Sequence, residues 1–209
     1  MWKISVVFIL VAASGTFFIT SSVYQQSSKE NEQRTFFDAS KNLHIMGVVL
    51  GKSTLRDAEI AFRSRSDSAI FLYPKPTEEG SEPRYTGKLE AYFPSIADHS
   101  KVVLTLNITP SKLETMRQRA SKPRIYPNGV IRMNLSSKDI LAVQKMTATK
   151  LTLIPSLQLD ESMVYAQFGQ PESINKETAT ITHFMYPKIG LIATINLEEK
   201  DQLTFTNTP

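Results

Sequence analysis

The sequence predicts an α+β protein in which an N-terminal transmembrane helix is followed by two small lobes, each with short helices packed on one face of an antiparallel sheet. Three observations predict it. The chain begins with a long uncharged apolar run, several later segments alternate apolar and polar residues as strands do, and capped helical segments precede these strand groups. With 209 residues the chain can bury a core, and without Cys it has no disulfide, thiolate metal site or lipidated cysteine.

The N-terminal segment predicts how the chain is located. No charged residue occurs from Ile4 to Tyr24, and these residues would form a helix of about 30 Å, the thickness of a bilayer core. Lys3 favours a cytoplasmic N-terminus with the rest of the chain outside. We therefore expect residues 1–24 to be a single-pass anchor in a bacterial inner membrane, with the C-terminal region in the periplasm.

A cleaved signal peptide is the alternative, with a cut near Ala13. Against cleavage, Phe17 and Phe18 extend the apolar run beyond that point. Residues 25–42 are polar apart from Phe36 and Phe37, and we interpret them as a solvated stalk whose end begins the folded part.

Residues 43–110 are predicted to form the first lobe. Thr54 caps a helix with Asp57 at its third position. Three strands are then predicted by alternation in the segments AIFLYP, KLEAYF and KVVLTLNI, with the Pro- and Glu-rich segment PKPTEEGSEP as an exposed loop between the first two.

Residues 111–149 are predicted to be a basic helical connector, with short helices over 112–120 and 138–146. The turn Tyr126-Pro-Asn-Gly129 joins two strands or a strand and a helix. Residues 112–150 hold nine basic groups against two acidic ones, whereas residues 151–209 hold three against seven. We interpret the basic segment either as a solvated linker between two domains or as a docking site for an acidic partner, anionic lipid headgroups or a sugar polymer.

Residues 150–209 are predicted to form the second lobe. Asp160 caps its helix, which Gly169 and Pro171 end. The segments ATITHFMYP, GLIATINL and QLTFT alternate as strands, and the turn over 198–201 indicates a hairpin. Both halves therefore share one layout, with a short apolar segment, a capped helix and about three strands.

The second half resembles the BamE-like family of small envelope domains. The residues that carry the resemblance are Leu159, Asp160, Val164, Phe168, Gly169, Pro171, Tyr186, Gly190, Leu191, Leu203 and Phe205. In the first half, residues 51–54 with Ala58 and Phe62 fit the opening of the pattern, but RSRSDS replaces the Gly-x-Pro that ends the helix.

A tandem of such domains is similar to the β-lactamase-inhibitor-protein architecture. The resemblance implies a protein-binding or scaffolding role in the bacterial envelope. Members of the outer-membrane-assembly branch are lipoproteins, and since this chain has no Cys their lipid anchor does not carry over.

Motifs for catalysis are weak throughout. Gly51-Lys52-Ser53 imitates the end of a P-loop, but Gly47 stands one residue too close for the phosphate cradle. His44, His99 and His183 have no second ligand at helical spacing, and no nucleophile elbow occurs. We therefore expect no catalytic residue, no cofactor and no metal site.

The function that we expect is binding. A non-catalytic, membrane-anchored periplasmic protein would recruit or stabilise an envelope protein complex, and the candidate partner-binding residues are Arg117, Arg119, Lys122 and Arg124. The alternative is a secreted or periplasmic inhibitor of a hydrolase that uses the same tandem fold. Nucleic acid is not an expected partner, because the basic segment lacks interleaved aromatic residues apart from Tyr126 and the anchor places it on the periplasmic side of the membrane.

Overall fold

The computed structural model describes residues 35–76 and 84–207. It divides into two units, Met1–Phe36 and Phe37–Pro209. Within the first unit the description is limited to two residues of strand β1 (Thr35–Phe37). The expected anchor over 1–24 and most of the expected stalk lie outside the described residues. Across the two described ranges, no helix combines the length and the apolar character needed to cross a bilayer.

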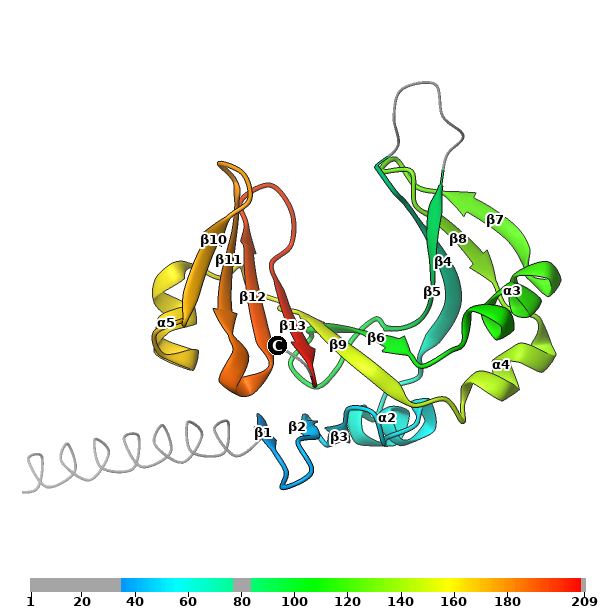
Figure 1. Ribbon diagram of the computed structural model, residues 1–209, viewed down its shortest axis with the longest axis horizontal. Coiled ribbons are helices and arrows are strands. Elements are labelled where there is room, and N and C mark those ends of the chain that lie inside the picture. The colour runs from blue at the N-terminus through cyan, green and yellow to red at the C-terminus, as the bar shows by residue number, and fades with distance from the viewer. Residues whose placement is uncertain (1–34, 77–83, 208–209) are drawn as a thin grey trace, which may run out of the picture. The chain divides into compact units, whose positions relative to one another are not determined.

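The second unit is built on one antiparallel sheet of ten strands (Figure 1). From one edge to the other the strands are β10 (Ser173–Lys176), β11 (Ile181–Tyr186), β12 (Leu191–Asn196), β13 (Gln202–Thr206), β9 (Ala148–Ile154), β6 (Lys101–Leu106), β5 (Tyr85–Phe93), β4 (Asp67–Pro74), β8 (Ile131–Asn134) and β7 (Ser121–Ile125). The α+β class with an antiparallel sheet is therefore confirmed. A smaller sheet contains the antiparallel pair β2 (Leu43–Ile45) and β3 (Val48–Val49).

Four α-helices occur among the described residues: α2 (Leu55–Phe62), α3 (Pro110–Arg119), α4 (Ser137–Val143) and α5 (Glu161–Phe168). A 3₁₀ turn, η1, follows β11 at Pro187–Ile189. The predicted caps are present. Thr54 forms a reciprocal capping box with Asp57, and Asp160 accepts a hydrogen bond from the Met163 N–H. These local signals explain where the helices begin.

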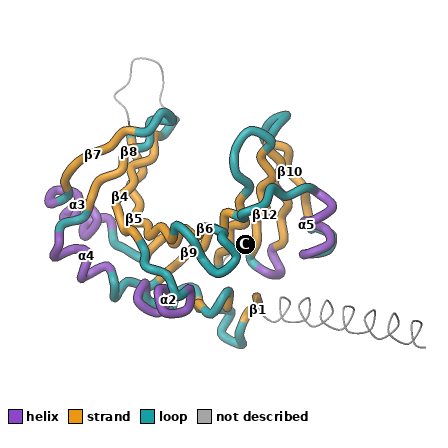
Figure 2. The backbone as a smooth tube through the Cα atoms, turned by 180° about the vertical axis from the view of Figure 1, so that it is seen from behind, coloured by secondary structure: helices purple, strands orange, loops and turns teal. Residues whose placement is uncertain are grey.

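The helices cover a single face of the large sheet (Figures 1 and 2). On this face Phe62 of α2 packs edge-on against Phe93 of β5, with ring centroids 5.0 Å apart. Tyr165 of α5 packs in the same way against Phe184 of β11. Alternate residues of the central strands point to this face and form one continuous buried cluster.

The sheet and its core continue from the first predicted lobe into the second. Strand β6 of residues 43–110 pairs with β9 of residues 150–209, with Val103 opposite Thr152, and β9 in turn pairs with β13.

Strand β12 begins just after Gly190, whose φ of 61° suits a residue without a Cβ. An added Cβ there would lie 2.2 Å from the Thr206 carbonyl oxygen.

The connector differs from the sequence prediction. Residues 111–149 contain the expected helices, but they also contribute strands β7 and β8, which extend the large sheet beyond β4. The turn at Tyr126–Gly129 joins these two strands. All five residues of β7 and all four of β10 are exposed, so neither edge strand has the alternation of buried residues that would reveal it in the sequence.

Candidate functional site on the helix-free face of the sheet

The face of the large sheet opposite the helices is called the open face. It consists of the side chains that alternate with the core residues, and the pairing of the strands sets them in rows. One row crosses the sheet through Glu90, Thr105 and Lys150 on β5, β6 and β9. The neighbouring row passes through Tyr92, Val103 and Thr152 on the same strands. Figure 1 shows that the sheet bends with its open face on the inside.

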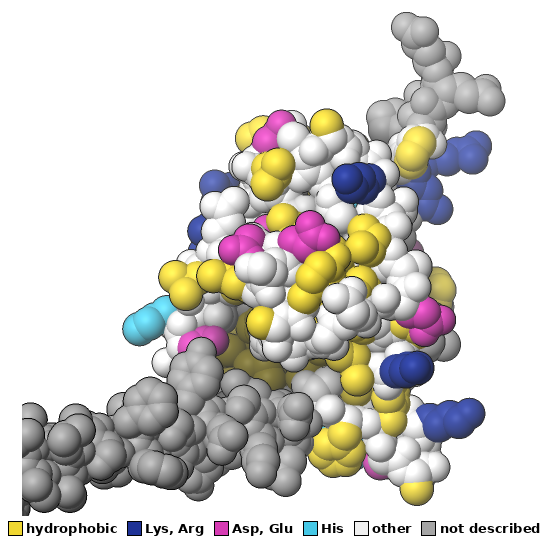
Figure 3. Space-filling view, turned by 90° about the vertical axis from the view of Figure 1, so that its left-hand side faces the viewer, with side chains coloured by type: hydrophobic (Ala, Val, Ile, Leu, Met, Phe, Trp, Pro, Cys, Tyr) yellow, Lys and Arg dark blue, Asp and Glu magenta, His cyan; other side chains and the backbone are white. Residues whose placement is uncertain are grey.

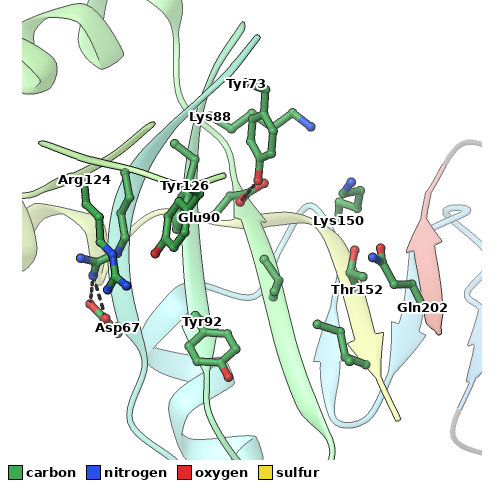
Figure 4. A pocket seen from close by; sticks show the side chains of 14 residues that line it. Asp67, Tyr73, Lys88, Glu90, Tyr92, Arg124, Tyr126, Lys150, Thr152 and Gln202 are labelled. Atoms are coloured by element: carbon green, nitrogen blue, oxygen red, sulfur yellow. Dashed lines mark hydrogen bonds and ion pairs between the residues drawn. The ribbon is translucent and has the colours of Figure 1, made fainter. Parts of the chain in front are cut away.

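A groove of about 660 Å³ lies on the open face. Four aromatic rings line it (Phe71, Tyr73, Tyr92 and Tyr126), together with four cations (Lys88, Arg124, Arg132 and Lys150) and two carboxylates (Asp67 and Glu90). The side chains come from strands that are far apart in the chain, and most of them point into the groove in Figure 4. The groove therefore combines flat apolar walls with an excess of positive charge.

The β4–β5 wall is held by contacts around Tyr73. Its hydroxyl donates a hydrogen bond to Oε2 of the buried Glu90 over 2.7 Å. Burial, and then the bond to Glu90, raises the pKa of Tyr73 far above its usual range. The Lys88 ammonium lies 4.7 Å from the centre of the Tyr73 ring. The Phe71 ring stacks on the Tyr73 ring, with 6.4 Å between the two ring centroids.

The β7–β8 wall is held by two arginines. Arg132 donates to both carboxylate oxygens of Asp67, at 2.9 and 2.7 Å, and to Asn134. Arg124 lies over the Tyr126 ring, 5.2 Å from its centre. Arg132 is therefore neutralised within the chain, whereas the neighbour found for Arg124 in the described part of the chain is an aromatic ring.

Lys150 of β9 lines the groove on the same side as Thr152 and Gln202 (Figure 4). It is half-buried, and among the described residues no hydrogen bond or ion pair to its ammonium is found. Burial lowers the pKa of Lys150, the charge of Lys88 lowers it further, and Glu90 opposes both effects. The β9 strand therefore holds a poorly solvated cation next to a second one.

The four predicted partner-binding residues have different neighbours in the structure. Arg117 forms an ion pair with Glu114 on the same helix at 2.7 Å. Arg119 donates hydrogen bonds of 2.6 and 3.1 Å to the buried carboxylate of Asp139. Lys122 is exposed on β7, and Arg124 is the member of the set that lines the groove.

Most of the groove was not identified from the sequence. Its residues stand at alternate positions of strands that were predicted from their apolar partners, as with Lys88, Glu90 and Tyr92 between Leu89, Ala91 and Phe93. The signal in the sequence is the alternation itself, since aromatic and charged residues occupy every second position of a strand whose other positions are apolar. No comparable pattern indicates that β6 lies between β5 and β9 in the sheet.

The other weak motifs of the sequence do not converge on a site. Gly51 begins the turn into α2, and its N–H is bonded to the Ala148 carbonyl. His183 contacts Glu177 at 2.7 Å and Thr194 at 2.9 Å. Within the part of the chain that the structure describes, no group of three potential metal ligands is found.

The side of the molecule that carries α5 has a different character. Figure 3 shows carboxylates and exposed apolar side chains next to one another on this surface. Met163 of α5 and Ile174 of β10 are each 47% exposed. Apolar groups of this kind scattered over a surface are common, and they define no groove.

No family model, curated protein or solved structure matches the chain.

Proposed function

We propose that the chain is a non-catalytic binding protein of the bacterial envelope, which recruits or stabilises a protein complex through the open face of its sheet. In this proposal residues 1–24 anchor it in the inner membrane, and its two BamE-like lobes, halves of one sheet, lie in the periplasm. The observation that carries the proposal is the groove, in which aromatic rings and cations project from hydrogen-bonded strands of the large sheet.

The chemistry of the groove supports protein binding. Aromatic residues and arginine contribute most to affinity in protein interfaces, because they give large contact areas with little loss of conformational freedom. Tyr92 and Tyr126 supply such rings, and Arg124 supplies a cation without an anionic partner in the described residues. Strand β5, which carries Tyr92, is paired with β4 on one side and β6 on the other, so little ordering of its backbone is needed on binding.

The experiment uses the full-length chain in the membrane of a Gram-negative host. A photo-crosslinking amino acid is placed at Tyr92 on the open face or at Leu141, which is 72% exposed on α4. The expected result is stoichiometric capture of one envelope protein from position 92 and none from position 141. The mature N-terminus is read by mass spectrometry, and an intact Met1 or Trp2 is expected.

Two results would change the proposal. Equal capture from both positions, or none from position 92, would contradict docking on the open face. A cut near Ala13 and a soluble chain that captures a hydrolase from position 92 would make the protein an inhibitor instead.

A further inference from the structure

The groove contains two lysines for which no anionic partner is found among residues 35–76 and 84–207. For Lys88, the contact found is the 4.7 Å approach to the Tyr73 ring. For Lys150, no ion pair within 4.0 Å is found in the described residues, although burial limits its access to water. A cation that is partly removed from water without a counter-charge is costly, and an anion from outside the chain would relieve that cost.

The two carboxylates that line the groove are already bonded. Glu90 accepts the Tyr73 hydroxyl at 2.7 Å, and Asp67 accepts two hydrogen bonds from Arg132. Glu90 still lies close enough to influence Lys150, so it offsets part of the positive charge. Four cations against two carboxylates leave the groove with an excess of positive charge, which Glu90 alone does not cancel.

A third observation lies in the same row. Thr105 stands between Glu90 and Lys150 in the strand register. Its hydroxyl oxygen is buried, and no hydrogen-bond partner for it is found among the described residues. Buried hydroxyls in folded proteins almost always have a partner, so Thr105 differs from its neighbours in this row, although it does not line the groove itself.

We propose that the groove binds an acidic peptide segment of the partner protein, with a carboxylate held by Lys88 and Lys150 and the neighbouring peptide packed on Tyr92 and Tyr126. The inference rests on the proposed function and names the chemistry of the partner.

A peptide fits this site better than a membrane surface does. The open face lies on the inside of the bend in the sheet (Figure 1), where a flat bilayer has poor access. An extended peptide can place one carboxylate at the lysines and uncharged side chains at the aromatic rings.

The test measures fluorescence anisotropy of a labelled oligo-glutamate peptide added to the full-length chain in a non-ionic detergent. An oligo-glutamine peptide is the neutral control. Lys150→Gln and Lys88→Gln are each expected to weaken binding about tenfold or more, because each removes a charge-assisted contact. Lys145→Gln changes an exposed lysine near α4 and should leave binding unchanged. Added salt should weaken binding of the unchanged chain.

Several outcomes would overturn the inference. The inference fails if the oligo-glutamate and oligo-glutamine peptides bind equally well. It also fails if Lys145→Gln weakens peptide binding as much as the groove variants do, or if the groove variants do not weaken it. Binding to phosphatidylglycerol vesicles that depends on Lys150, without peptide binding, would assign the site to lipid. An unchanged unfolding midpoint confirms that a variant is folded. If crosslinking from position 92 succeeds while the lysine variants capture the same partner equally well, docking stands and the acidic-peptide inference fails.

Discussion

Strand β5 presents two contrasting surfaces within nine residues. Leu89, Ala91 and Phe93 are completely buried beneath the helices, whereas Lys88 and Tyr92 face the groove. The helix-covered face is apolar and close-packed, as a core must be. The open face has polar, aromatic and charged groups, and for some of them the described residues supply no partner. In our proposal, stability and binding therefore depend on opposite sides of the same strands, so each can be tested separately.

The largest effect that would break or support this division is expected at the core face. Phe93→Ala removes a buried ring that packs on Phe62, and it should lower the free energy of unfolding by about 3–5 kcal/mol. Tyr92→Ala, one residue away on the open face, should cost less than half as much. Urea denaturation of both variants measures the difference, and equal losses would contradict the division.

A smaller effect is expected at the ion pair between α3 and α4. Asp139 is 2% exposed and accepts hydrogen bonds from Arg119 and the Ser136 hydroxyl. Asp139→Asn should lower stability by about 1–3 kcal/mol. Glu114→Gln breaks the exposed pair with Arg117 and should cost at most about 0.5 kcal/mol.

This ion pair also predicts a dependence on pH. The hydrogen bonds from Arg119 hold the pKa of Asp139 below its usual range, although burial opposes them. A carboxyl with a lowered folded-state pKa stabilises the protein above its unfolded pKa, near 3.9, and the contribution is lost as pH falls through the folded value. The variant should therefore approach the stability of the unchanged chain in acid. A gap that stays constant from neutral pH to acid would contradict this.

The smallest effect separates a helix cap from an open-face hydroxyl. Thr54→Ala removes the cap of α2 and should cost about 1 kcal/mol. Thr204→Ala loses a 3.3 Å contact with Thr152 on the open face and should cost only a few tenths of that. Thermal unfolding would rank them, and the reverse order would show that the open face contributes more to stability than we infer.

Local chemistry made parts of the fold predictable. The caps at Thr54 and Asp160 and the alternation in β5, β6 and β12 act over a few residues, so the sequence displays them directly. Strands β7 and β10 could not be predicted in this way, because both their faces are exposed and no apolar pattern marks them.

The candidate site was less predictable. Arg117, Arg119 and Arg124 look alike in the sequence, yet each has a different neighbour: Glu114, Asp139 and Tyr126. The meeting of Lys88 with Lys150 depends on the order β5, β6, β9 in the sheet. Pairing between strands so far apart in the chain is decided by the whole fold, and local patterns do not encode it.

The central claim is that the partner docks on the open face, and blocking each face in turn tests it most directly. The chain has no Cys, so Tyr92→Cys and Leu141→Cys each create a single labelling site. Each variant is coupled to a bulky maleimide–polyethylene glycol and offered to the partner found by crosslinking. We expect the label at position 92 to abolish capture and the label at position 141 to leave it unchanged. Capture that survives at position 92 and fails at position 141 would place the interface on the helix-covered side and contradict the account.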